Sequence, residues 1–286
     1  METRPLFSPT PDTPSTPSTL QRLRVRLRRL SSKPPMLAYL GFLLVLGAWG
    51  TGRGELLLRA LIMLAVYSVL DLAIARWREG KFILPNAGWI SGLILALVLT
   101  PSAPWLAILL ATVCASVSKH LIRYKRKHMF NPAAFGLVIT SILFQDVGMV
   151  SWWGAAWGML PLVIIVASGA VTVFRVKRWK TALVFLLTYF TGTILVLLAR
   201  GGNVTDIRTI VFDGTVWFFA TVMLIEPVTT AYQPAWLRTV FGGIVALLTL
   251  VFSVGGIALS VIDPFLAALL LGNAAATGAS RWIRGR

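Results

Sequence analysis

The chain has 286 residues, of which 57% are hydrophobic and only 13% are charged, and its formal net charge is +17. Soluble domains carry about 25% charged residues, so this composition indicates an integral membrane protein. Its apolar stretches do not alternate with polar residues, which argues against a transmembrane β-barrel. The basic residues lie between the apolar stretches, so we interpret them as topology signals and expect no binding of nucleic acid.

The first 33 residues are expected to form a unit of their own. Residues 1–19 are rich in proline, serine and threonine, which predicts disorder. Residues 20–30 place leucines at helical spacing among five arginines. This pattern predicts either a basic amphipathic helix on an anionic membrane surface or a solvated, positively charged flank. No cleavable signal peptide is expected, because the first apolar run begins behind this long polar tail.

Residues 34–286 are expected to form one membrane domain with ten apolar segments. The segments are residues 36–50, 55–76, 84–99, 102–119, 131–145, 156–174, 181–199, 210–225, 237–254 and 262–280. A complete span needs about 20 residues. Several segments are shorter, so we expect half-helices or helices that extend into their polar flanks.

The charges of the loops support this count. With the N-terminus in the cytoplasm and ten alternating spans, 23 of the 27 lysines and arginines fall on the cytoplasmic side. Such an asymmetry is a strong positive-inside signal, which one miscounted span would have destroyed. We therefore expect a multi-pass protein of the cell inner membrane with both termini in the cytoplasm.

The chain has few cysteine and histidine side chains that could bind a metal. Cys114 is the single cysteine, and it cannot form an internal disulfide or a cysteine-rich cluster by itself. His120 and His128 flank a basic cluster, and we interpret them as solvated residues at the membrane interface. No metal site and no catalytic residue are predicted.

Four X-Pro pairs stand beside apolar segments and suggest an internal repeat. The pairs are Thr100-Pro101, Asn131-Pro132, Glu226-Pro227 and Asp263-Pro264. Equivalent pairs are 126 and 132 residues apart, which indicates five segments followed by five more. Because five is odd, the second copy enters the membrane in the opposite sense. The expected fold is therefore an all-α polytopic membrane protein of ten helices in two inverted five-helix repeats.

These pairs also suggest a binding site. Asn or Asp followed by Pro is a favoured helix start, and a helix N-terminus within the membrane presents free N–H groups and a positive dipole end to a ligand. We predict a central site where these helix ends converge; the alternative is that each pair is an ordinary interfacial cap. Glu226 is a functional candidate because a carboxylate is costly to bury in a membrane, although it could instead lie at the interface near Arg238. Asp71 is expected to pair with Arg76 or Arg78 at the interface.

Several stretches resemble a known family of membrane proteins. They are SGLILALVLTPSAPW, SKHLIRYKRKHMFNPAAFGLVI, FFATVMLIEPVTTAYQP and IDPFLAALLLGNAAA, and they lie within residues 84–280. The family comprises the B subunit of the sodium-translocating NADH:quinone reductase and the D subunit of the Rnf electron-transport complex. The resemblance implies ten helices in two inverted repeats, a fold shared with urea transporters.

The resemblance further implies electron transfer through flavins. The residues that we expect around the cofactor or the ion path are Thr100, Asn131, Pro132, Glu226, Pro227, Thr229 and Asp263, with Asn131, Glu226 and Asp263 as helix caps. Better-known members of the family attach FMN to a threonine between segments five and six. Here that loop reads FQDVGMVSWWGAAW and has no threonine. We therefore expect no covalent FMN; FMN or riboflavin bound non-covalently is the remaining option, and Trp152, Trp153 and Trp157 would either stack on it or form an aromatic belt.

The sequence thus predicts a membrane component of a flavin-dependent electron-transfer complex, with ion translocation as a further expectation. It would act with other subunits in the lipid bilayer rather than as an enzyme by itself. The alternative is a small-solute channel or transporter on the same scaffold, since a shared fold does not settle function. A third option is a structural scaffold that holds partner subunits.

Overall fold

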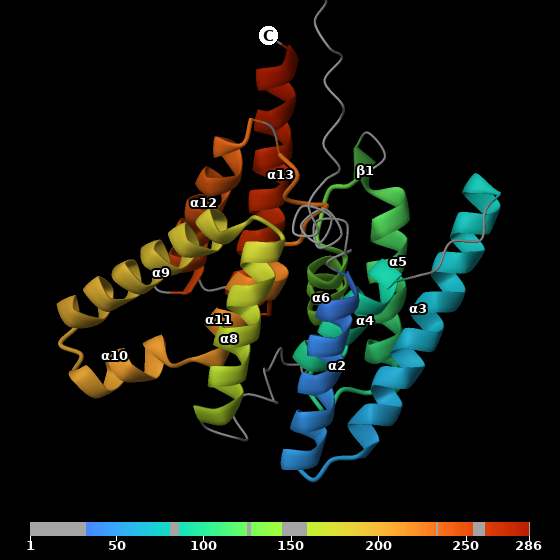
Figure 1. The fold of residues 1–286 in the computed structure, drawn as a ribbon, viewed down its shortest axis with the longest axis horizontal. Coiled ribbons are helices and arrows are strands. Elements are labelled where there is room, and N and C mark those ends of the chain that lie inside the picture. The colour runs from blue at the N-terminus through green and yellow to red at the C-terminus, as the bar shows by residue number, and fades with distance from the viewer. Residues whose placement is uncertain are drawn as a thin grey trace, which may run out of the picture. The chain divides into compact units, whose positions relative to one another are not determined.

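The structure, a computed structural model, describes six stretches of the chain: residues 33–80, 86–124, 127–144, 159–232, 234–253 and 261–285. The predictions for the N-terminal tail and for the three tryptophans of the loop after segment five lie outside these residues. Figure 1 shows the described part as an assembly of helices with one short hairpin.

The helices of the first half are α2 (Lys33–Gly50), α3 (Glu55–Glu79), α4 (Asn86–Val98), α5 (Trp105–Leu121) and α6 (Pro132–Leu143). A hairpin of β1 (Arg123–Tyr124) and β2 (Lys127–His128) lies between α5 and α6. The helices of the second half are α8 (Met159–Arg175), α9 (Trp179–Ala199), α10 (Val204–Val211), α11 (Gly214–Phe218), the π-helix η1 (Phe219–Met223), α12 (Trp236–Ser253) and α13 (Pro264–Gly285). Each of the ten predicted apolar segments contains helix, so the all-α prediction is confirmed.

Two features of the second half differ from the prediction. Residues 210–225 do not form one straight span, because α11 passes directly into the five residues of η1. The preceding helix, α10, was not predicted; Asn203 and Asp206 begin it with a reciprocal capping box, in which each side chain accepts a backbone N–H.

Among the described residues, three helices are long and apolar enough to cross a membrane: Glu55–Arg78, Trp179–Ala199 and Trp236–Ser253. Their outward faces carry large apolar side chains, such as Leu61 at 62% exposure and Leu187 at 58% exposure. Helix α6 has only 12 residues, so at about 1.5 Å per residue it is shorter than the roughly 30 Å hydrocarbon layer. Short helices of this kind were expected for residues 131–145 and 84–99.

Small residues allow the helices to pack closely, as is common in membranes. A Cβ atom on Gly136 of α6 would lie 2.3 Å from the carbonyl oxygen of Ala111 in α5. A Cβ atom on Gly242 of α12 would lie 2.3 Å from the carbonyl oxygen of Thr181 in α9. Any side chain at either glycine would therefore collide with backbone, and both helix pairs depend on glycine.

The order of helix pairs recurs in the two halves. In the first half α2 packs on α4, α3 on α5, and α5 on α6. In the second half α8 packs on α11, α9 on α12, and α12 on α13. The halves meet where α2 contacts α8 and where α6 contacts α13.

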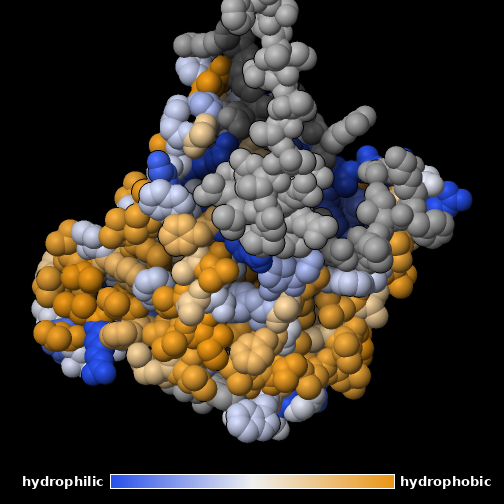
Figure 2. Space-filling model, viewed as in Figure 1, coloured by the Kyte–Doolittle hydropathy of each residue, from blue (hydrophilic) through white to orange (hydrophobic). Residues whose placement is uncertain are grey.

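The basic loops meet at one end of the helices. Arg78 donates to the carbonyl oxygen of His120 at 2.5 Å, and the Arg281 guanidinium lies 4.5 Å from the ring centre of Tyr124. At the other end of α3, Arg59 donates to the carbonyl oxygen of Pro101 at 2.6 Å. We call the first end, which includes the hairpin and the last turns of α13, the basic end; both lie at the top of Figure 1. Figure 2 shows apolar residues over much of the visible face, below hydrophilic residues at the top.

Candidate functional site

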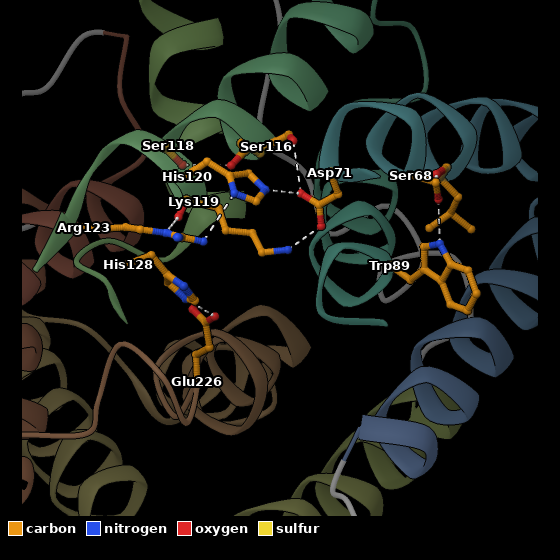
Figure 3. A network of polar contacts seen from close by, with 12 residues as sticks. Ser68, Asp71, Trp89, Ser116, Ser118, Lys119, His120, Arg123, His128 and Glu226 are labelled. Carbon is orange, nitrogen blue, oxygen red and sulfur yellow. Dashed lines mark hydrogen bonds and ion pairs between the residues drawn. The ribbon is translucent and has the colours of Figure 1, made fainter. Parts of the chain in front are cut away.

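A contact between the two halves lies at the basic end. The hairpin pairs Arg123 with His128 and Tyr124 with Lys127, which fixes the position of His128. The His128 Nε2 atom lies 2.9 Å from the Glu226 Oε1 atom, and the two side chains are only 10% and 20% exposed. Figure 3 shows this pair in the lower part of the view. The interpretation of His128 as a solvated interface residue is therefore wrong, and the side-chain carboxylate of Glu226 has His128 as a partner.

Asn131 forms a second link between the halves. It is 2% exposed, and its Oδ1 atom accepts from the Ala134 N–H at 3.1 Å, with Pro132 at the first position of α6. This is the predicted N-cap geometry. Its Nδ2 atom donates to the carbonyl oxygen of Met223, the last residue of η1, at 3.1 Å. Carbonyls at a helix end need such partners. The Asn131 side chain therefore provides a hydrogen-bond partner both for an N–H group at the start of α6 and for a carbonyl at the end of η1.

The segment after η1 forms a tight turn around Glu226. The Glu226 carbonyl oxygen accepts from the Thr230 N–H at 3.1 Å and from the Thr230 hydroxyl at 2.6 Å. The Thr229 hydroxyl donates to the Glu226 Oε2 atom at 3.3 Å. Pro227, which has no N–H to satisfy, stands within this turn. Glu226-Pro227 is thus a turn and not a helix start.

A small cavity of about 80 Å³ lies beside this turn. Its lining includes Tyr124, Lys127, His128, Met129, Val228, Thr229, Ala231, Tyr232, Thr277 and Ser280. The Tyr232 hydroxyl donates to the Asn273 Oδ1 atom at 2.9 Å, and the buried Nδ2 atom of Asn273 has no hydrogen-bond partner among the described residues. Of the residues predicted to bind a cofactor, Thr229 lines this cavity and Glu226 contacts it through His128.

Thr100 and Asp263 lie elsewhere. Thr100 lines a smaller cavity with Arg59, and its carbonyl oxygen accepts from the Ala103 N–H at 3.0 Å, so Thr100-Pro101 also forms a turn. Asp263 is a true N-cap, since its Oδ1 atom accepts from the N–H groups of Phe265 at 2.9 Å and Leu266 at 3.1 Å. The structure therefore gathers Asn131, Pro132, Glu226, Pro227 and Thr229, but it does not bring all seven predicted residues to one point.

Asp263 is nevertheless close to the same π-helix. It lines a cavity of about 30 Å³ with Val98, Phe219 and Met223. Met223 is the residue whose carbonyl Asn131 binds. The two helix starts, Asn131 and Asp263, thus approach η1 at a shared residue.

A second polar cluster at the basic end was not predicted. Asp71 is 4% exposed, and its Oδ1 atom lies 2.8 Å from His120 Nε2 and 3.3 Å from the Ser116 hydroxyl. Its Oδ2 atom forms an ion pair with Lys119. Figure 3 shows Asp71 of α3 facing these residues of α5.

The expected partners of Asp71 were therefore wrong. Arg76 instead donates to the Gly80 carbonyl oxygen, and Arg78 donates to the carbonyl oxygen of His120. A residue five positions further along a helix points about 140° away, so Arg76 cannot share the face of Asp71 that packs on α5. His120 is 6% exposed, so it is not a solvated histidine either.

Within the described residues, no group of three or more histidine, cysteine, aspartate or glutamate side chains is placed to hold a metal ion.

No family model matches the chain. Curated relatives carry the name of the D subunit of an ion-translocating oxidoreductase complex. The protein from Pseudomonas paraeruginosa is 35% identical over 108 residues, which are 36% of this chain and 31% of the relative. The protein from Escherichia coli is 34% identical over 124 residues, which are 43% of this chain and 33% of the relative. The resemblance to the D subunit of the Rnf complex is confirmed over this part of the chain. The match spans about a third of the relatives' length.

The apolar helices and this resemblance agree on the class of protein. The chain is a multi-pass membrane protein, because its helices include spans of sufficient length and its relatives are named as subunits of an ion-translocating oxidoreductase complex of the Rnf family. The prediction of both termini in the cytoplasm stays a prediction.

Proposed function

We propose that this chain is the membrane component of an ion-translocating electron-transfer complex, and that it holds FMN or riboflavin non-covalently in the cavity at the basic end. The names of the relatives support the first part, since they describe one subunit of an ion-translocating oxidoreductase complex. They also favour it over a small-solute channel. The observation that supports the site is the contact of His128 with Glu226, which joins the two halves beside this cavity.

The residues at this cavity are suited to a flavin. Tyr124 offers an aromatic ring, Lys127 a cation, and Thr229 a hydroxyl group, and all three line the cavity. A flavin presents an aromatic ring system with polar edges, and FMN adds a phosphate, so each feature has a partner of matching chemistry. The flavin supplies the redox chemistry when it is bound, and the chain supplies binding and orientation.

We further propose that the two halves are inverted repeats. The recurring order of helix pairs supports this, with α3 on α5 and α9 on α12 as the equivalent long helices. The two N-caps support it as well, because α6 starts at the basic end while α13 ends there. The positive-inside rule then places the basic end, with both termini, in the cytoplasm of a cell whose inner membrane holds the complex.

The experiment is purification of the full chain with its partners at native abundance, followed by acid precipitation and measurement of released flavin. Flavin in the supernatant at a fixed ratio to the chain is expected, because a non-covalent cofactor is released on unfolding. Thr229→Val should lower flavin affinity by about tenfold, the value of one lost hydrogen bond of roughly 1.4 kcal/mol. Thr209→Val removes an exposed hydroxyl of α10 that bonds only to a backbone carbonyl, so it serves as the matched control. A complex that contains all its partners and no flavin would exclude the proposal.

A further inference from the structure

A buried arginine without a carboxylate partner lies at the start of α9. Arg178 is 9% exposed, and its Nε atom donates to the Thr230 hydroxyl at 3.0 Å. Within the described stretches, no carboxylate lies within ion-pair distance of Arg178, and its two terminal nitrogens have no hydrogen-bond acceptor. Burial, and then the neighbouring Arg238, lowers the pKa of Arg178 to about 10. The guanidinium is therefore still charged at neutral pH, and a buried charge without a counter-charge is costly.

The surrounding contacts hold this arginine in one orientation. The Thr230 hydroxyl that receives the Arg178 Nε–H itself donates to the Glu226 carbonyl oxygen at 2.6 Å. The Arg238 Nε atom donates to the Tyr232 carbonyl oxygen at 3.0 Å, and the Arg238 carbonyl oxygen accepts from the Thr181 hydroxyl at 3.0 Å. Both guanidinium groups are thus fixed through Nε, which leaves their terminal N–H groups available for a ligand.

Two helix N-termini add positive potential at the same place. Thr181 of α9 faces Gly242 of α12, and further along Gly192 faces Leu250, so the two helices run parallel. Their N-termini therefore lie together beside Arg178 and Arg238. The positive dipole ends of both helices favour an anion at this point.

The neighbouring surface indicates where the anion comes from. Trp179 and Trp236 are the first residues of α9 and α12, and they are 42% and 56% exposed. Phe174, at 65% exposure, stacks on Trp179 with ring centroids 6.3 Å apart. Exposed tryptophans at the ends of apolar helices mark the headgroup level of a bilayer. The arginines thus lie at the depth of lipid phosphates.

We propose that Arg178 and Arg238, together with the N-termini of α9 and α12, bind the phosphate group of an anionic membrane phospholipid. Arginine suits this ligand, because its planar fork matches phosphate oxygens in a bidentate manner. The phosphate supplies the counter-charge that Arg178 otherwise lacks. The two sources of such a phosphate, a lipid headgroup and the free ion, require separate arms of the test.

The test is thermal unfolding of the purified full chain in detergent, followed by tryptophan fluorescence, with three additives: phosphatidylglycerol, phosphatidylcholine and inorganic phosphate. We expect phosphatidylglycerol to raise the unfolding temperature in a saturable manner. Phosphatidylcholine should need at least a tenfold higher concentration to produce the same rise. Inorganic phosphate at equal concentration should have no effect. If inorganic phosphate alone reproduces the rise, the lipid assignment is overturned.

Variants locate the site. Arg178→Gln and Arg238→Gln should each weaken the response to phosphatidylglycerol at least tenfold, since each loses a charge-assisted pair of hydrogen bonds. Lys177→Gln removes the same charge from an exposed neighbouring residue and should change the response less than about twofold. Without lipid, Arg178→Gln should unfold at the same temperature as the wild type or higher, because it removes an uncompensated buried charge. An equal loss in Lys177→Gln, or a full response in both arginine variants, would overturn the proposal.

Discussion

Replacing Asn131 by alanine tests whether one side chain stabilises both halves of the protein. Its Oδ1 atom caps α6 through the Ala134 N–H, and its Nδ2 atom binds the Met223 carbonyl oxygen, 92 residues away. Loss of an N-cap costs about 1 kcal/mol. Loss of the second bond leaves a buried carbonyl without a partner, and interhelical hydrogen bonds in membranes contribute about 0.6 to 1.7 kcal/mol. We expect Asn131→Ala to lower the free energy of unfolding by about 2 kcal/mol.

Asn131→Ser separates the two contributions. Serine is a good N-cap, so α6 should keep its cap, but the hydroxyl is too short to replace the amide that reaches Met223. The expected loss is therefore only that of the bond to Met223, about 1 kcal/mol. Asn203→Ala is the matched control, because Asn203 caps the exposed helix α10 and binds nothing beyond its own helix.

The assay is equilibrium unfolding in mixed micelles of a mild detergent and sodium dodecyl sulfate, monitored by tryptophan fluorescence. The loss for Asn131→Ala should exceed that for Asn203→Ala by about 1 kcal/mol. If the two losses are equal, or if Asn131→Ser is as stable as the wild type, the bond to Met223 contributes nothing and the link between the halves is not real.

Two further substitutions test the packing and the buried ion pair. Gly242→Ala should destabilise the protein by at least about 2 kcal/mol in the same assay, because the new Cβ atom would lie 2.3 Å from the backbone oxygen of Thr181. Gly41→Ala is the control and should be near neutral, because no atom lies within 4 Å of its new Cβ atom. Asp71→Asn should lower the free energy of unfolding by about 3 kcal/mol, because it leaves Lys119 without its counter-charge. A loss below about 1 kcal/mol would mean that Lys119 remains hydrated.

The sequence was sufficient to predict the helices and two of the helix starts. Continuous apolar runs locate helices because a membrane accepts little else, and the loop charges gave the number of segments. Asn131 and Asp263 cap helices as expected, since their short side chains accept N–H groups two or three residues further on. Thr100-Pro101 and Glu226-Pro227 form turns instead, because proline also favours turns and no Asn or Asp precedes it there.

The partners of the buried polar residues could not be predicted, because they come from distant parts of the chain. His128 and Glu226 are 98 residues apart, and His120 and Asp71 are 49 residues apart. No local pattern specifies either pair, so the positively charged surroundings suggested solvated histidines. A carboxylate within an apolar run was a usable signal, since such a group must find a partner in the protein.

Two helix starts at different ends of the molecule lie near the short π-helix η1. The Met223 carbonyl stands at a helix end, and the residue four positions later is Pro227, which has no N–H, so this carbonyl needs a partner from outside the helix. Asn131 provides it at Met223, while Phe265, two residues after Asp263, packs against Phe219 at the first turn of η1 with ring centroids 5.1 Å apart. The chain thus ends this helix at Pro227 and pairs the Met223 carbonyl across the contact between the halves. The end of η1 lies three residues before Glu226, at the edge of the proposed flavin site.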